Sequence, residues 1–142
     1  MKKLLFGLLL AFSIQHAAAQ TGNITVVING IKNTNGNIEI GLYNSQTGFA
    51  VYSENYKKIT ESPSKSSLEC TFKNIPTGTY AIAVWHDENK NKEIDKNWFG
   101  VPTEYYGFSL NKYGTFGPPD FKDVSFKLNS NQTKSLTIQL TK

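Results

Sequence analysis

Apolar and polar residues alternate with a period of two along six short segments of the chain. Such alternation is typical of β-strands that bury one face. Turn-forming Asn, Gly, Pro and Ser residues separate these segments from one another. The six segments are residues 24–29, 38–43, 68–72, 80–85, 124–128 and 136–140. Because no helical crossover separates them, the pattern predicts an all-β, antiparallel β-sandwich.

Two segments interrupt the alternation. Residues 45–62 carry apolar side chains without a strict period, and either a short helix or an irregular edge segment fits them. Residues 87–120 form a predicted loop, much longer than ordinary connections of about four to six residues. We expect this loop to be ordered, because aromatic residues are available to anchor it. They are Trp98, Phe99, Tyr105, Tyr106, Phe108, Tyr113 and Phe116.

The first residues have the pattern of a signal peptide. Lys2 and Lys3 precede an apolar run at residues 4–14, and three alanines at residues 17–19 fit a cleavage site. The sequence therefore predicts a signal peptide at residues 1–19 and a single domain at residues 20–142, periplasmic or secreted. No second apolar run reaches membrane length, so we expect no transmembrane segment after signal removal.

Composition narrows the range of functions further. The net charge is +4 with the two leader lysines included, and every basic residue is a lysine. Arginine is the usual residue for bidentate phosphate and base recognition, so we do not expect a nucleic-acid partner. Cys70 is the only cysteine, and it alternates with Leu68 and Phe72 on one strand face. We interpret it as a small packed hydrophobe and not as a nucleophile.

Oxygen-bearing side chains recur at alternate positions where the long loop begins. If Asp87 is counted as position one, Asn89, Asn91 and Asp95 fall at positions three, five and nine. Glu93 would offer its backbone carbonyl at position seven. These positions match the first part of an EF-hand-type loop, which surrounds Ca²⁺ with oxygen ligands.

The sequence differs from an EF-hand calcium loop at two positions. Lys92 stands where glycine makes the sharp turn, and Trp98 stands where a bidentate glutamate closes the shell. Glu104 is the candidate for the missing carboxylate. We expect a weak site, in the range of ~10⁻⁴–10⁻³ M that extracellular modules show. The alternative is that the Asp and Asn side chains only cap turns through hydrogen bonds to the backbone.

The loop aromatics allow another kind of site. Trp98, Tyr105, Tyr106 and Tyr113 could stack on sugar rings or on a peptide; alternatively, they bury against the sandwich and hold the loop. His86 is the only histidine after the leader, and we expect a structural hydrogen bond for it at the mouth of the loop. No nucleophile-elbow, phosphate-cradle or dinucleotide motif is present, so we expect no enzymatic activity.

Two further runs suggest relatives. Residues 72–81, Phe-Lys-Asn-Ile-Pro-Thr-Gly-Thr-Tyr-Ala, resemble the strand–turn–strand unit of transthyretin-like and carboxypeptidase-regulatory-like sandwiches. Combined with the Asp-x-Asn-x-Asn-x-x-x-Asp loop and Gly-x-Pro-x-Glu-x-x-Gly-Phe-Ser at residues 100–109, the chain resembles a family of small exported bacterial proteins of unknown function. The resemblance implies an immunoglobulin-like (transthyretin-like) sandwich and no established activity. Tyr80, just after the turn, is a candidate tyrosine corner that ties a sandwich turn.

Together these observations predict an exported, non-enzymatic β-sandwich whose long loop binds Ca²⁺ weakly and orders a binding surface. The partner would be an unknown envelope or extracellular protein, or a glycan. The competing hypothesis is a carbohydrate- or peptide-binding module that uses the loop aromatics without a metal.

Overall fold

A computed structural model of the chain describes residues 20–142. The predicted signal peptide at residues 1–19 lies outside the described residues. The strands are β1 (Thr21–Asn29), β2 (Asn37–Tyr43), β3 (Lys57–Glu61), β4 (Ser67–Pro76), β5 (Gly78–Asp87), β6 (Tyr106–Phe108), β7 (Phe126–Leu128) and β8 (Thr133–Gln139). The short helices are η1 (Tyr52–Glu54), η2 (Ser109–Asn111) and α1 (Phe121–Val124).

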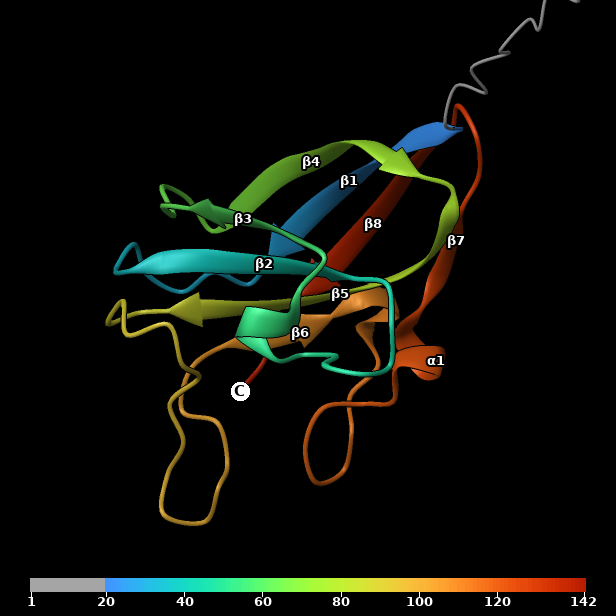
Figure 1. Ribbon diagram of the computed structural model, residues 1–142. Helices are drawn as coiled ribbons and strands as arrows, with labels where there is room; N and C mark the ends of the chain where they lie inside the picture. The colour runs from blue at the N-terminus through green and yellow to red at the C-terminus, as the bar shows by residue number, and fades with distance from the viewer. Residues whose placement is uncertain (1–19) are drawn as a thin grey trace, which may run out of the picture.

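The strands form two sheets (Figure 1). One sheet has the order β4-β1-β8, and the other has the order β3-β2-β5-β6 with β7 also paired to β5. The chain passes from the first sheet to the second between β4 and β5. The Tyr80 hydroxyl donates a hydrogen bond of 2.9 Å to the carbonyl of Pro76, which ties this crossing as a tyrosine corner would. The prediction of an all-β fold with two sheets is confirmed, whereas the immunoglobulin-like or transthyretin-like type stays a prediction.

The main core contains inward-facing residues from both sheets. On β1, Ile24, Val26 and Ile28 are fully buried, and the residues between them are half-buried. Residues of β2, β4, β5, β7 and β8 also belong to this core, which explains why the period of two identified these strands. Cys70 packs against the core and is half-buried, so it behaves as the small hydrophobe that we expected.

One pair of neighbouring strands differs from the prediction. We expected antiparallel pairing throughout, but β1 and β8 run parallel, with Ile28 opposite Ile138. Alternation of apolar residues sets which face of a strand is buried and carries no information about strand direction. The prediction was therefore wrong for this pair of strands, which lie far apart in the sequence.

The sequence pattern left one strand open, missed a second and misplaced the start of a third. β3 lies in the segment at residues 45–62, where Ile59 is the one strand residue that is not exposed. That segment also holds η1, so both a short helix and an edge strand are present. β6 has three residues and lies inside the predicted loop. Val124 is buried at the end of α1, so the strand predicted from residue 124 begins at Phe126.

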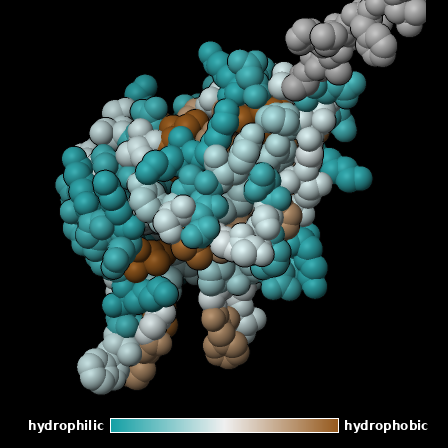
Figure 2. All heavy atoms as spheres, viewed as in Figure 1, coloured by the Kyte–Doolittle hydropathy of each residue, from teal (hydrophilic) through white to brown (hydrophobic). Residues whose placement is uncertain are grey.

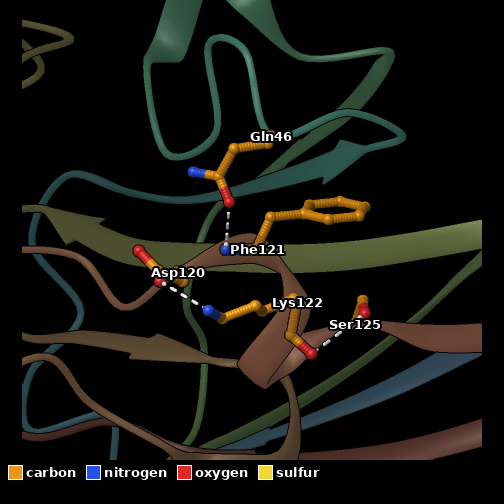
Figure 3. Close-up of polar contacts among 5 residues, drawn as sticks. All are labelled: Gln46, Asp120, Phe121, Lys122 and Ser125. Carbon is orange, nitrogen blue, oxygen red and sulfur yellow. Dashed lines mark hydrogen bonds and ion pairs between the residues drawn. The ribbon is translucent and has the colours of Figure 1, made fainter.

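The outer face of the second sheet is covered by a second apolar cluster. Its buried members are Tyr43, Phe49, Ala81, Ala83, Phe108 and Val124. The segment that carries Phe49 is joined to α1, because the Gln46 side-chain oxygen accepts a hydrogen bond of 2.9 Å from the Phe121 amide (Figure 3). In α1, Lys122 pairs with Asp120 at 3.4 Å and Ser125 donates to the Lys122 carbonyl. The end of the long loop at residues 87–120 is therefore held at α1 against the second sheet.

Candidate functional site

The candidate calcium loop begins at the end of β5. Asp87 is the last residue of that strand, and its side chain is fully buried. One carboxylate oxygen accepts a hydrogen bond of 3.1 Å from the Asn91 amide, and the other accepts one of 3.0 Å from the Lys92 amide. A single buried carboxylate therefore closes the turn that follows the strand.

Asn89, Asn91 and Asp95 converge inside this turn. The side-chain amides of Asn89 and Asn91 donate to the two carboxylate oxygens of Asp95, at 2.7 and 2.9 Å. Their side-chain oxygens accept hydrogen bonds from the amides of Asn91 and Glu93, at 3.0 and 2.9 Å. These are the bonds that the turn-capping interpretation requires. They also gather the oxygen-bearing side chains that the calcium interpretation requires.

Glu104 lies further along the same loop, and its side chain contacts the turn that follows β5. It is 4% exposed, and its two carboxylate oxygens accept hydrogen bonds from the amides of Glu88 (2.9 Å) and Asp95 (3.1 Å). Burial raises the pKa of this carboxyl above its usual value, and the negative charges of Asp95 and Asp87 raise it further. The two backbone hydrogen bonds act in the opposite direction. A nearby cation would offset the crowding of these carboxylates.

The backbone of the loop turns sharply at the position predicted for it. Lys92, at position six of the loop, has φ of 64°, and Lys90 has φ of 61°. Glycine occupies position six in EF-hand loops because the turn needs this conformation. Within residues 20–142, however, no three His, Cys, Asp or Glu side chains form a metal-binding group.

An open groove of about 680 Å³ lies beside the loop. Residues 92–96 of the loop line it, together with the outer face of β5. Its aromatic lining comes from Tyr52, Trp85, Tyr106 and Phe108, and the rings of Tyr52 and Trp85 meet edge to face at 5.2 Å. Trp85 is 8% exposed, and its indole N–H has no hydrogen-bond partner within residues 20–142. A buried donor without a partner is uncommon, and it suits a groove that accepts a polar ligand group.

The aromatics predicted to bind a ligand do not share one surface. Tyr106 lines the groove. Tyr113 packs on Tyr106 and donates to the Gln139 carbonyl at 2.6 Å, and Tyr105 packs against the core beneath Lys142. Trp98 lies far out on the loop and is 97% exposed.

Anchoring of the loop was predicted correctly for only some of its aromatics. Tyr105, Tyr106 and Phe108 pack against the sandwich. Trp98, Phe99 and Phe116 do not, with exposures of 97%, 87% and 102%. The anchoring role assigned to these three residues was wrong, because they lie at turns that project away from the sheets (Figure 1).

Sequence reasoning also missed Trp85 and Tyr52 as lining residues of the groove. Trp85 stands on the face of β5 opposite the main core, and a large aromatic residue at this outer-face position was the available signal. Tyr52 lies in a segment whose structure the pattern left open. His86 behaves as expected, since its Nε2 lies 2.6 Å from the Asn35 carbonyl and the residue is fully buried.

The Gly-Phe-Ser part of the second motif has a structural explanation. A side chain at Gly107 would lie 2.6 Å from Ile138, so only glycine fits there. Phe108 belongs to the outer apolar cluster. Ser109 is fully buried and accepts a hydrogen bond of 3.0 Å from the Ile82 amide. These residues position the loop; Phe108 also lines the groove, whereas Gly107 and Ser109 are not among its lining residues.

The fold and the site define a small two-sheet β-protein with a carboxylate- and amide-rich loop beside an aromatic groove. The chain belongs to the bacterial family described as "uncharacterized protein conserved in bacteria" (DUF2141), whose family model matches residues 26–136. No curated protein and no solved structure shows significant similarity to the chain. Across residues 20–142, every helix is too short or too polar to cross a membrane.

Proposed function

We propose that this protein is an exported, non-enzymatic binding module whose loop at residues 87–104 binds Ca²⁺ and thereby fixes one wall of the aromatic groove. The module would act in the periplasm or outside the cell, on an envelope or extracellular protein or on a glycan. One observation carries the proposal. Asn89, Asn91 and Asp95 converge in a turn that Asp87 and Glu104 close, and residues 92–96 of the same turn line the groove.

Both the charges of the loop and its order support calcium binding. Asp87 and Glu104 are buried carboxylates, and Asp95 lies close enough to raise the pKa of Glu104. A hard cation with oxygen ligands would offset their repulsion and hold the turn more tightly. The loop carries lysines as well, which lower the affinity. A ligand in the groove would then meet a wall whose shape depends on the ion.

Thermal unfolding tests whether the protein binds Ca²⁺. The wild-type protein is unfolded in chelator, in millimolar Mg²⁺ and in increasing Ca²⁺. An ion at about 100 times its dissociation constant stabilises the folded state by about 2.7 kcal/mol. We expect Ca²⁺ to raise the melting temperature of the wild type and of the matched control Asp123→Asn, which changes an exposed carboxylate outside the loop.

The variant Asp95→Asn should lose most of this calcium effect while remaining folded in chelator. It removes the carboxylate toward which both Asn amides point. A wild-type melting temperature that does not respond to Ca²⁺ would rule out the metal. An equal response in Asp95→Asn would show that Ca²⁺ binds elsewhere.

A second candidate function is a carbohydrate- or peptide-binding module that needs no metal. The unpartnered indole N–H of Trp85 and the nearby rings of Tyr52 and Tyr106 favour it. In a Trp98→Phe background, Trp85 is the remaining tryptophan, so its fluorescence reports on the groove. Changes on adding oligosaccharides or peptides that persist in chelator and vanish in Tyr106→Ala would support this function. A flat titration across a broad panel would count against it.

A further inference from the structure

Two loops project from the same end of the sandwich and carry exposed apolar residues (Figures 1 and 2). The first tip is residues 97–103, where Trp98 is 97% exposed and Phe99 is 87% exposed. The second tip is residues 114–118, where Phe116 is 102% exposed. Both loops border the groove, since residues 92–96, just before the first tip, and Pro118, the last residue of the second tip, line it. Large aromatic side chains this exposed cost free energy in water and commonly mark an interaction site.

The charge distribution around the tips is uneven. Neither tip contains a charged residue. Lys96 immediately precedes the first tip, and Lys112 lies two residues before the second, and both are exposed. Asp95 and Glu104 also flank the first tip, and the exposed Asp120 lies two residues after the second, so the bases carry charges of both signs. Uncharged apolar tips above charged bases suit a phospholipid surface, which is apolar inside and carries charged, hydrated headgroups.

The backbone of the first tip is hydrogen-bonded within itself. The Asn97 side-chain oxygen accepts hydrogen bonds from the amides of Phe99 (2.9 Å) and Val101 (3.1 Å). The Asn97 carbonyl accepts another from the Gly100 amide at 2.9 Å, and its amide donates to the Val101 carbonyl at 2.9 Å. Pro102 has no amide hydrogen. The amides of Asn97, Phe99, Gly100 and Val101 are thus paired, which lowers the cost of moving the turn out of water, because unpaired groups carry most of the desolvation penalty.

We propose that the two tips insert into the interfacial region of a phospholipid bilayer. Trp and Phe favour this region, where apolar rings meet hydrated headgroups. Two narrow, separate projections can enter such a fluid layer, whereas a folded partner would have to supply two matching cavities. The lysines at their bases would contact the headgroups. The inference concerns different residues from the proposed calcium ligands and stands apart from that function.

Vesicle binding tests the proposal with the full mature chain. Trp98 serves as the reporter, because it is the exposed one of the two tryptophans. Vesicles of phosphatidylethanolamine and phosphatidylglycerol are used with and without bromine on the acyl chains, in calcium and in chelator. We expect Trp98 emission to shift to the blue and to be quenched by the brominated chains in at least one of these buffers. Co-sedimentation gives the binding constant independently of fluorescence.

Matched variants test whether vesicle binding depends on the two tips or on exposed apolar residues in general. The double variant Phe99→Ser/Phe116→Ser should bind at least about tenfold more weakly, because burying aromatic rings supplies the attraction. Tyr56→Ser, at a 39% exposed apolar residue outside both tips and outside the groove, should bind as the wild type does. Lys96→Gln/Lys112→Gln should weaken binding to vesicles with phosphatidylglycerol and leave binding to neutral phosphatidylcholine vesicles unchanged. Circular dichroism confirms that each variant is folded.

Three results would overturn the proposal. The first is no co-sedimentation at millimolar lipid in either buffer. The second is equal binding by the wild type and the folded Phe99→Ser/Phe116→Ser variant. The third is a dimer in sedimentation velocity that the same variant abolishes without any vesicle binding, which would assign the tips to a second copy of the chain.

Discussion

Ser109 fills a gap in the hydrogen bonding along one edge of β5. β7 pairs with residues 78–80 of that strand, and β6 pairs with residues 83–85. Between these two partners the Ile82 amide donates to the Ser109 hydroxyl oxygen at 3.0 Å. The hydroxyl in turn donates to the Val124 carbonyl at 2.5 Å, which joins α1 to the same edge. A fully buried serine here satisfies backbone groups that no strand reaches.

Replacing Ser109 with alanine should therefore destabilise the protein by about 1–3 kcal/mol, because a buried amide and a buried carbonyl lose their partner. Urea unfolding monitored by far-UV circular dichroism measures the difference. Ser135→Ala, at an exposed position of β8, is the control and should change the free energy of unfolding by less than about 0.5 kcal/mol. A Ser109→Ala variant as stable as this control would show that water replaces the hydroxyl.

Cys70 provides a prediction about pH. Burial raises the pKa of its thiol from 9.0 to about 11, and the charges of Glu61 and Glu69 add to the shift. Because the folded pKa lies above the unfolded one, the thiol's contribution to stability is complete below pH 9. It falls as the pH rises from about 9 to about 11. The difference in unfolding free energy between wild type and Cys70→Ala should follow this course.

The same thiol should resist alkylation in the folded protein. At pH 8 a thiol of pKa about 11 is ionised in roughly one molecule in a thousand, and only the thiolate reacts. Iodoacetamide labelling followed by mass spectrometry should be slow in buffer and fast in urea. Rapid labelling of the folded chain at pH 8 would contradict the packed environment described for Cys70.

At the scale of elements, the strands predicted from the sequence are those that bury a full row of side chains. β1 buries every second residue, so a period of two was sufficient to locate it. β3 is an edge strand with exposed lysines, and β6 has three residues, so neither carries a detectable period. The parallel pairing of β1 and β8 could not be predicted, because it depends on how distant segments meet.

Part of the candidate calcium loop could be predicted, because its residues lie close together in the sequence. Spacing alone brought Asp87, Asn89, Asn91 and Asp95 together, because a turn of nine residues folds on itself. Glu104 was proposed as a returning carboxylate, and it contacts the amides of Glu88 and Asp95. The groove was not foreseen, since it needs the segment around Tyr52 to cover the outer face of β5.

Backbone strain at Lys92 gives a prediction for this loop. Its φ of 64° is left-handed, a conformation that costs a residue with a side chain about 1 kcal/mol. Glycine adopts it freely, although glycine also gains entropy when unfolded. We expect Lys92→Gly to stabilise the protein by a few tenths to about 1 kcal/mol in chelator. Lys92→Gln removes the same charge and keeps the strain, so it should be close to neutral.

These two variants separate geometry from charge in the proposed calcium site. If the sharp turn limits binding, Lys92→Gly should strengthen the calcium-dependent rise in melting temperature more than Lys92→Gln does. Equal gains in the two variants would mean that the lysine charge alone weakens the site. A Lys92→Gly variant that is less stable than Lys92→Gln in chelator would contradict the strain argument.

For the whole molecule, the end of β8 joins the two sheets along one side. Within the first sheet β8 pairs with β1, and the Leu140 amide continues the contact by donating to the Asn29 carbonyl at 2.9 Å. One residue later, Thr141 exchanges two hydrogen bonds of 2.9 Å with Tyr106 of the second sheet. Asn111 also accepts a hydrogen bond of 2.8 Å from the Gln139 amide. The two sheets are therefore connected by backbone bonds as well as by the core between them.

This connection predicts that Thr141 contributes to the free energy of unfolding through its backbone amide and not through its side chain. Thr141→Pro removes the amide that donates to Tyr106, so it should lower the free energy of unfolding by about 1–3 kcal/mol. Thr141→Ala retains the amide and should be close to neutral. In the Trp98→Phe background, Trp85 fluorescence reports on the second sheet and circular dichroism reports on both, so coincident urea transitions would show that the sheets unfold together. Separate transitions in that background, or equal stability of Thr141→Pro and Thr141→Ala, would show that this junction does not couple the sheets.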